Sequence, residues 1–240
     1  MTYFVFGVLP YIALTILIVG SIIRYERDPF TWKSSSSQLL RRKQLVWGSI
    51  LFHVGIIIVF FGHLVGMLTP VEVYHALGIG YGVKQVLAIV VGGIAGAMAI
   101  VGGAMLLHRR FLDPRIRATS SLADSGILAL LFAQLILGMG TILASINHLD
   151  GSVMLLFMDW ARGIFTFQLD AWRSVADVSW IYKLHIFIGL LIFILFPFTR
   201  LVHMLSVPLR YLTRPGYQIV RSRRSKALPR RSGSVSGAAE

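Results

Sequence analysis

Four histidines in two strongly apolar stretches are the residues best able to do chemistry in this chain. His53 and His63 lie ten residues apart in one stretch, and His185 and His203 lie 18 residues apart in another. Polar groups are costly inside a bilayer, so four histidines in two membrane segments need a stronger reason than simple hydrogen bonding. Neutral imidazoles are good ligands for haem iron, and two of them hold one b-type haem. We therefore expect two haems and a protein that moves electrons.

The composition indicates the environment in which these ligands work. Of the 240 residues, 56% are hydrophobic and only 14% are charged, against about 25% in an average globular protein. The charge-free runs approach or exceed the ~20 residues needed to cross a bilayer. The chain has no cysteine, which excludes disulfides, protein-held iron–sulfur clusters and thiolate-ligated haem. Histidine is left as the strong ligand.

The apolar runs predict an all-α integral membrane protein with five transmembrane helices. The first run has no basic leader or cleavage pattern, so we interpret it as a retained span. Val153–Phe167 is apolar but interrupted by Asp159 and Arg162, which favours an interfacial amphipathic helix over a sixth span. The five spans are expected at about residues 3–23, 45–68, 85–107, 125–146 and 183–203.

The basic residues predict the orientation. Of the 23 Lys and Arg residues, 19 lie after span one, after span three or from Arg200 onward, so we place the N-terminus outside and the C-terminus in the cytoplasm. The same distribution argues against a nucleic-acid partner despite the net charge of +13. We expect residues 1–215 to form the domain in the cell inner (cytoplasmic) membrane. Residues 216–240 are expected to form a basic, disordered cytoplasmic tail.

This topology assigns a depth to each histidine. His63 and His185 fall near the outer side, and His53 and His203 near the inner side, so each level has one ligand pair. On straight helices His185 and His203 share a face, whereas His53 and His63 are about 80° apart. The pairs also differ in axial separation, ~15 Å on span two against ~27 Å on span five. Tilt and a kink at Pro197 would have to absorb that mismatch.

Several other residues near these levels have two interpretations each. Lys84, at the outer mouth of span three, is either a snorkelling interfacial anchor or a donor to a quinol oxygen. Gly55, Gly62 and Gly66 are expected to leave room for a porphyrin face. Three arginines at the inner level either pair with haem propionates or serve only as topogenic charges: Arg109, Arg110 and Arg200. Three histidines outside the spans are expected to be solvated: His75, His108 and His148.

Specific motifs surround these residues over nearly the whole chain, to about Arg221. They are HVGI at 53–56, FGH at 61–63, GMLTP at 66–70, VKQ at 83–85, RIRAT at 115–119, HLDGS at 148–152, LFPFTRLVH at 195–203, SVP at 206–208 and YLTR at 211–214. In these stretches the chain resembles the gamma subunit of respiratory nitrate reductase, a membrane di-haem cytochrome b. The tail beyond Arg221 is longer than the family pattern, and we assign it no role.

The resemblance implies a set of roles and partners. It implies an outer haem b held by His63 and His185 and an inner haem b held by His53 and His203. Lys84 occupies the position of the family's quinol-site lysine, with Gly62 and His63 beside it. The implied partners are membrane quinol, a cytoplasmic iron–sulfur beta subunit and a molybdopterin-containing alpha subunit. Quinol would release its protons outside, and its electrons would pass from the outer to the inner haem, then to the beta subunit and nitrate.

Two alternatives stay open at this point. A related di-haem cytochrome b could serve a sulfite or heterodisulfide reductase, because the haem scaffold does not encode the terminal acceptor. A haem-free membrane anchor or transporter is the alternative from a different class. Neighbouring genes would separate the first alternative, and an optical spectrum of reduced membranes would decide the second.

Overall fold

The predicted five-span, all-α architecture is confirmed. The computed structural model describes residues 1–28, 32, 40–118 and 120–205, and five of its helical segments are long and apolar enough to cross a membrane. The orientation stays a prediction, and the predicted tail lies outside the described residues. The first span, Phe4–Arg27, consists of the π-helix η1 (Phe4–Val8) and the α-helix α1 (Leu9–Arg27). The next three spans are α2 (Arg42–Leu68), α4 (Tyr81–Leu112) and α6 (Leu122–Ser145). The fifth span, Trp180–Phe198, consists of α8 (Trp180–Leu195) and the 3-10 helix η4 (Phe196–Phe198).

Shorter helices connect the spans at both ends of the bundle. They are α3 (Val71–Ala76), α5 (Pro114–Ala118), α7 (Ser152–Phe165) and the 3-10 helix η3 (Ala171–Val175). Another 3-10 helix, η5 (Arg200–Leu205), follows the fifth span. Local chemistry explains several boundaries. Thr69 is extended before Pro70, as residues before proline prefer, and α2 ends there. Ser121 accepts a hydrogen bond from the Asp124 N–H at 3.1 Å and so caps the start of α6.

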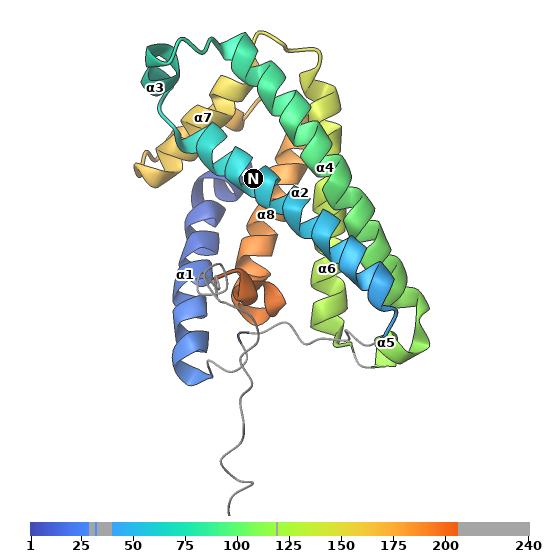
Figure 1. Ribbon diagram of the computed structural model, residues 1–240. Coiled ribbons are helices and arrows are strands. Elements are labelled where there is room, and N and C mark those ends of the chain that lie inside the picture. The colour runs from blue at the N-terminus through green and yellow to red at the C-terminus, as the bar shows by residue number, and fades with distance from the viewer. Residues whose placement is uncertain (29–31, 33–39, 119, 206–240) are drawn as a thin grey trace, which may run out of the picture. The chain divides into compact units, whose positions relative to one another are not determined.

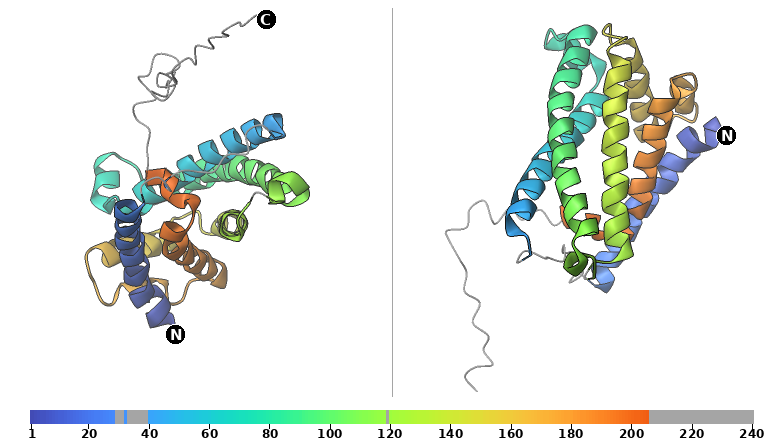
Figure 2. Two further views of the ribbon diagram at one scale, coloured as in Figure 1. Left: turned by 90° about the horizontal axis from the view of Figure 1, so that it is seen from below. Right: turned by 90° about the vertical axis from the view of Figure 1, so that its right-hand side faces the viewer.

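The spans pack as a series of neighbours. The main contacts run from α2 to α4, from α4 to α6, from α6 to α8 and from α8 to α1 (Figure 1, Figure 2). The helix α7 packs against α2 at the end of the bundle where α2 finishes and α4 begins (Figure 1). The two histidine-bearing spans, α2 and α8, are therefore separated in this series by α4 and α6.

Glycines set the closest of these contacts, between α2 and α4. A Cβ atom on Gly55 would lie 2.5 Å from the carbonyl oxygen of Ala95 and 2.7 Å from the backbone nitrogen of Ala99. Small residues allow helix backbones to approach in this way in a bilayer. Gly55 thus serves helix packing, and the expectation that it leaves room for a porphyrin face is wrong.

The amphipathic segment after span four is helical, as predicted, but its apolar face is not turned to lipid. Met158, Trp160 and Ile164 of α7 are buried, and the Trp160 indole N–H donates to the Phe6 carbonyl at 2.8 Å. The protein therefore covers this face, which ties α7 to the first span. At the start of the helix, the Ser152 hydroxyl and N–H donate to Asp150, and these hydrogen bonds lower the pKa of that exposed carboxyl.

Candidate functional site

The structure brings the four membrane histidines together in two pairs. The ring centroids of His63 and His185 are 6.2 Å apart with planes at 37°, and those of His53 and His203 are 6.3 Å apart with planes at 69°. Two imidazoles bonded at about 2 Å to opposite sides of one metal ion would have ring centres roughly 6.4 Å apart. Both separations fit a shared metal ion between the rings.

Hydrogen bonds prepare three of the four rings for metal binding. In His53, His63 and His203 the ring Nδ1 lies within hydrogen-bonding distance of a backbone carbonyl three or four residues earlier. A carbonyl oxygen only accepts, so Nδ1 carries the proton and the Nε2 lone pair is left for a metal. The carbonyls belong to Ser49, Val59 and Arg200, respectively.

The small number of protein ligands identifies the kind of metal group that would fit. Among the described residues, no group of three or more His, Cys, Asp or Glu side chains is placed to hold a bare metal ion. A pair of imidazoles suits a metal that brings its own equatorial ligands, as haem iron does. Each histidine pair therefore fits one b-type haem.

His203 reaches its partner because the fifth span is broken. The α-helix α8 ends at Leu195, and 3-10 helices follow at Phe196–Phe198 and Arg200–Leu205. Pro197 lacks an N–H and its ring clashes with the preceding turn, which explains the break. The expectation that His185 and His203 share one face of one helix is therefore wrong, because His203 lies on a separate element.

Charged side chains hold this broken segment in place. An Nη1 of Arg24, on α1, donates to the carbonyls of Pro197 and Thr199 at 2.8 and 2.7 Å. Arg200 makes a two-point ion pair with Asp124 of α6, Nε to Oδ1 at 2.8 Å and Nη2 to Oδ2 at 3.0 Å. These contacts are close in sequence to His203, so α1 and α6 together fix the position of this histidine.

These contacts bear on the other candidate residues of the inner level. Arg200 pairs with Asp124, and Arg109 donates to the Leu40 carbonyl at 2.8 Å, so protein contacts account for both without haem propionates. The side chains expected to be solvated are exposed in the structure: His75, His108 and His148.

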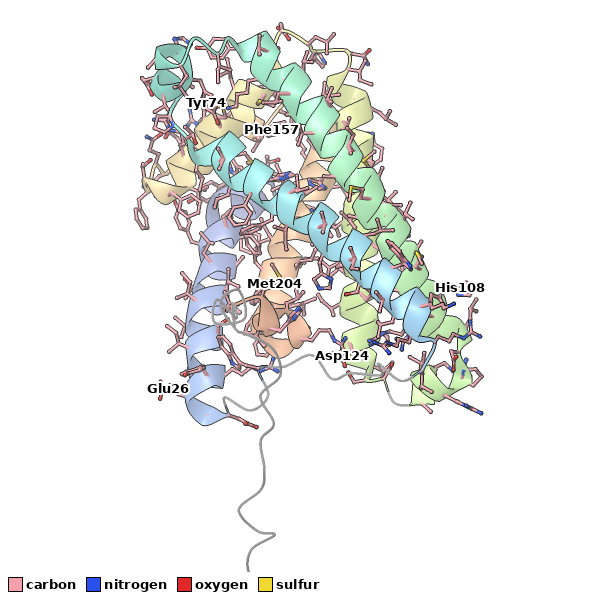
Figure 3. The ribbon with its side chains drawn as sticks, viewed as in Figure 1. Glu26, Tyr74, His108, Asp124, Phe157 and Met204 are labelled. Atoms are coloured by element: carbon pink, nitrogen blue, oxygen red, sulfur yellow. The ribbon has the colours of Figure 1, made fainter. Side chains whose placement is uncertain are left out.

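Lys84 is buried, which does not favour a snorkelling anchor. Its side chain lies in the first turn of α4 and the residue is only 7% exposed. Nζ donates to the Gly66 carbonyl at 2.7 Å and to Met158 Sδ at 2.8 Å, and it lies 3.9 Å from the centre of the Tyr74 ring. Figure 3 shows Tyr74 at the end of the bundle opposite Asp124. Sequence reasoning missed Met158 and Tyr74, because nothing in the sequence shows that either residue lies beside Lys84.

The α2 face beside this lysine is open. A Cβ atom on Gly62 or on Gly66 would meet no described atom within 4 Å, in contrast to Gly55. His63 lies between these two glycines in the sequence, and Gly66 supplies the carbonyl that Lys84 binds. Gly62 and Gly66 thus mark an open face of α2 next to His63 in the sequence, and the Gly66 carbonyl links this helix to Lys84.

Comparisons with known proteins show the family to which the chain belongs. The nitrate reductase gamma subunit family matches residues 2–223. The chain is 46% identical to respiratory nitrate reductase 2 gamma chain of Escherichia coli (strain K12), over 92% of this chain and 97% of the relative. It is 43% identical to nitrate reductase gamma chain of Bacillus subtilis (strain 168), over 90% and 96%. The chain therefore belongs to the nitrate reductase gamma subunit family and is a multi-pass cytochrome b subunit of a nitrate reductase complex in the cell membrane.

Proposed function

We propose that the chain oxidises membrane quinol near its outer end and delivers the electrons to a cytoplasmic iron–sulfur subunit of nitrate reductase. The observation that supports this proposal is that the four imidazoles form two pairs, with ring centroids 6.2 and 6.3 Å apart. One histidine of each pair lies on α2. In the proposal His63 and His185 hold an outer haem b, and His53 and His203 hold an inner one. When bound, the two haems supply one-electron carriers at both levels.

Lys84 is the proposed hydrogen-bond donor to a quinol oxygen. The Gly66 carbonyl and the Tyr74 ring hold its ammonium group beside the open face of α2. Its other partner, Met158 Sδ, is a weak acceptor that an incoming quinol oxygen can replace. Gly62 leaves room for the quinol ring next to His63, so the lysine and the outer ligand pair address the same ligand.

The distribution of charge supports the proposed direction. Arg24, Arg110 and Arg200 belong to the end of the bundle where α1 ends and α6 begins, the end marked by Glu26 and Asp124 in Figure 3. The positive-inside rule makes this the cytoplasmic end, where the iron–sulfur beta subunit would dock and pass electrons to the molybdopterin alpha subunit. Quinol protons would then leave on the opposite side. Release of those protons to the cytoplasmic face of vesicles holding the complex would contradict this orientation.

Single ligand substitutions in the assembled complex test the proposal. His203→Ala should remove one haem and leave the other reducible by quinol, whereas His63→Ala should abolish reduction by quinol. Haem content and reduced-minus-oxidised spectra of membranes measure both outcomes. Equal loss of both haems in each variant would refute separate pairs. Membranes that lack b-type absorption altogether would show a haem-free anchor.

A further inference from the structure

Gln134 is an unusual residue for its place in the chain. It lies in the middle of α6 and is the only polar side chain between Ser125 and Thr141. An amide in a membrane span needs a hydrogen-bond partner on a neighbouring helix, because lipid offers none. The partner that the structure provides is the histidine-bearing helix α8.

The amide of Gln134 lies against His185 through a reciprocal contact. Its Nε2 donates to the His185 carbonyl at 2.9 Å and lies 3.5 Å from the ring Nε2. A Cβ atom on Gly138, one turn after Gln134, would lie 3.2 Å from the His185 Cε1 atom. A Cβ atom on Gly189, one turn after His185, would lie 3.3 Å from the Gln134 Nε2 atom. A glycine on α6 thus lies against the His185 ring, and a glycine on α8 lies against the Gln134 amide.

His185 differs from the other three histidines in the support of its ring. The rings of His53, His63 and His203 have Nδ1 on a backbone carbonyl, which any side chain at the acceptor position would provide. The His185 Nδ1 and the Gln134 Oε1 are both buried and have no hydrogen-bond partner among the described residues. The ring of His185 is instead contacted by Gln134 Nε2 and by Gly138, both on α6.

We propose that Gln134 is the positioning residue for His185 in the outer ligand pair. Its amide holds the His185 backbone carbonyl and, together with Gly138, contacts the ring and fixes its position. This inference rests on the proposed function, because it needs His185 to be a haem ligand. Its consequence is that a side chain on α6 tunes the outer haem and has no such hold on the inner one.

The test uses the whole complex and the variant Gln134→Leu, which removes the amide and keeps the side-chain bulk. We expect a shifted midpoint potential and a shifted low-spin ferric EPR signal for the outer haem, with roughly tenfold weaker retention of that haem. The inner haem should titrate as in the wild type.

Two further variants keep the inference testable. Gln44→Leu removes an equivalent bond between helices, from Gln44 Nε2 to the Met105 carbonyl at 3.0 Å, and should leave the outer haem unchanged. Gly138→Ala adds a methyl group against the His185 ring and leaves the hydrogen bonds of Gln134 in place. If the Gln134→Leu protein does not accumulate, Gly138→Ala tests whether contacts from α6 set the position of this ring. We expect Gly138→Ala, too, to move only the outer haem.

The possible failures are distinguishable. A wild-type complex without two b-type haems would refute the proposed function itself. A complex with both haems in which Gln134→Leu and Gly138→Ala titrate like the wild type would refute only the role of Gln134. An equal shift of both haems in Gln134→Leu would also overturn it, because that result would indicate a general loss of structure.

Discussion

The contact between α2 and α4 predicts the cost of adding a single methyl group. In Gly55→Ala the new Cβ would lie 2.5 Å from the Ala95 carbonyl oxygen, 0.9 Å short of the 3.4 Å at which ordinary contact begins. Backbone atoms on both sides leave no flexible side chain to move, so α2 itself must shift. Overpacking of this kind costs about 1–3 kcal/mol. Because α2 carries His53 and His63, the same shift should disturb both ligand pairs.

The assay is unfolding in mixed micelles by increasing SDS, with haem absorption recorded on the same samples. Gly93→Ala is the matched control, because a Cβ there would meet no described atom within 4 Å. We expect the free energy of unfolding to fall by about 1–3 kcal/mol in Gly55→Ala, and to stay level or rise by up to about 1 kcal/mol in Gly93→Ala. If Gly55→Ala is as stable as Gly93→Ala and retains its haem, the assigned packing of α2 on α4 is wrong.

Two further substitutions test the two ends of the bundle. Lys84→Met removes the proposed quinol donor, and we expect quinol oxidation to fall roughly tenfold or more, as loss of a charge-assisted hydrogen bond implies, with haem absorption unchanged. Arg173→Gln, which neutralises a cation outside the proposed site, is the control. Wild-type quinol kinetics in Lys84→Met would exclude the lysine as the quinol donor. Asp124→Asn weakens the ion pair with Arg200, so the free energy of unfolding should fall by about 1–3 kcal/mol. The proposed inner haem, assigned to His203, should be retained less well than the proposed outer one. Haem quantification decides the latter, and equal retention of both haems would contradict it.

Features that depend on position along the bilayer normal could be predicted from the sequence. Hydropathy and length defined the five spans, and Pro70 marked the end of α2. The alternation of basic loops gave each histidine a level, and the structure has His53 beside His203 and His63 beside His185. Depth follows from residue number once a span is recognised, so these inferences needed no knowledge of side-by-side packing.

Features that depend on lateral packing could not be predicted in the same way. The spans are apolar on all sides, so periodicity does not show which face meets which neighbour. The sequence therefore did not reveal that Gly55 packs against α4, whereas a Cβ on Gly62 would meet no described atom within 4 Å, although both glycines lie on one helix. It likewise did not reveal the contact of Gln134 with His185, or the burial of Lys84 against Met158.

The break in the helix after Leu195 resolves the mismatch between the axial separations of the two histidine pairs that the sequence predicts. Straight helices would separate the two histidines of span two by ~15 Å and those of span five by ~27 Å along their axes, which two level pairs do not tolerate. The mismatch disappears when His203 leaves the axis of α8 on a separate 3-10 helix. Helical backbone hydrogen bonds are lost there, and Arg24 donates to two of the carbonyls that the break releases. The arginine and the proline are thus two parts of one arrangement, which brings the last histidine to the level of the first.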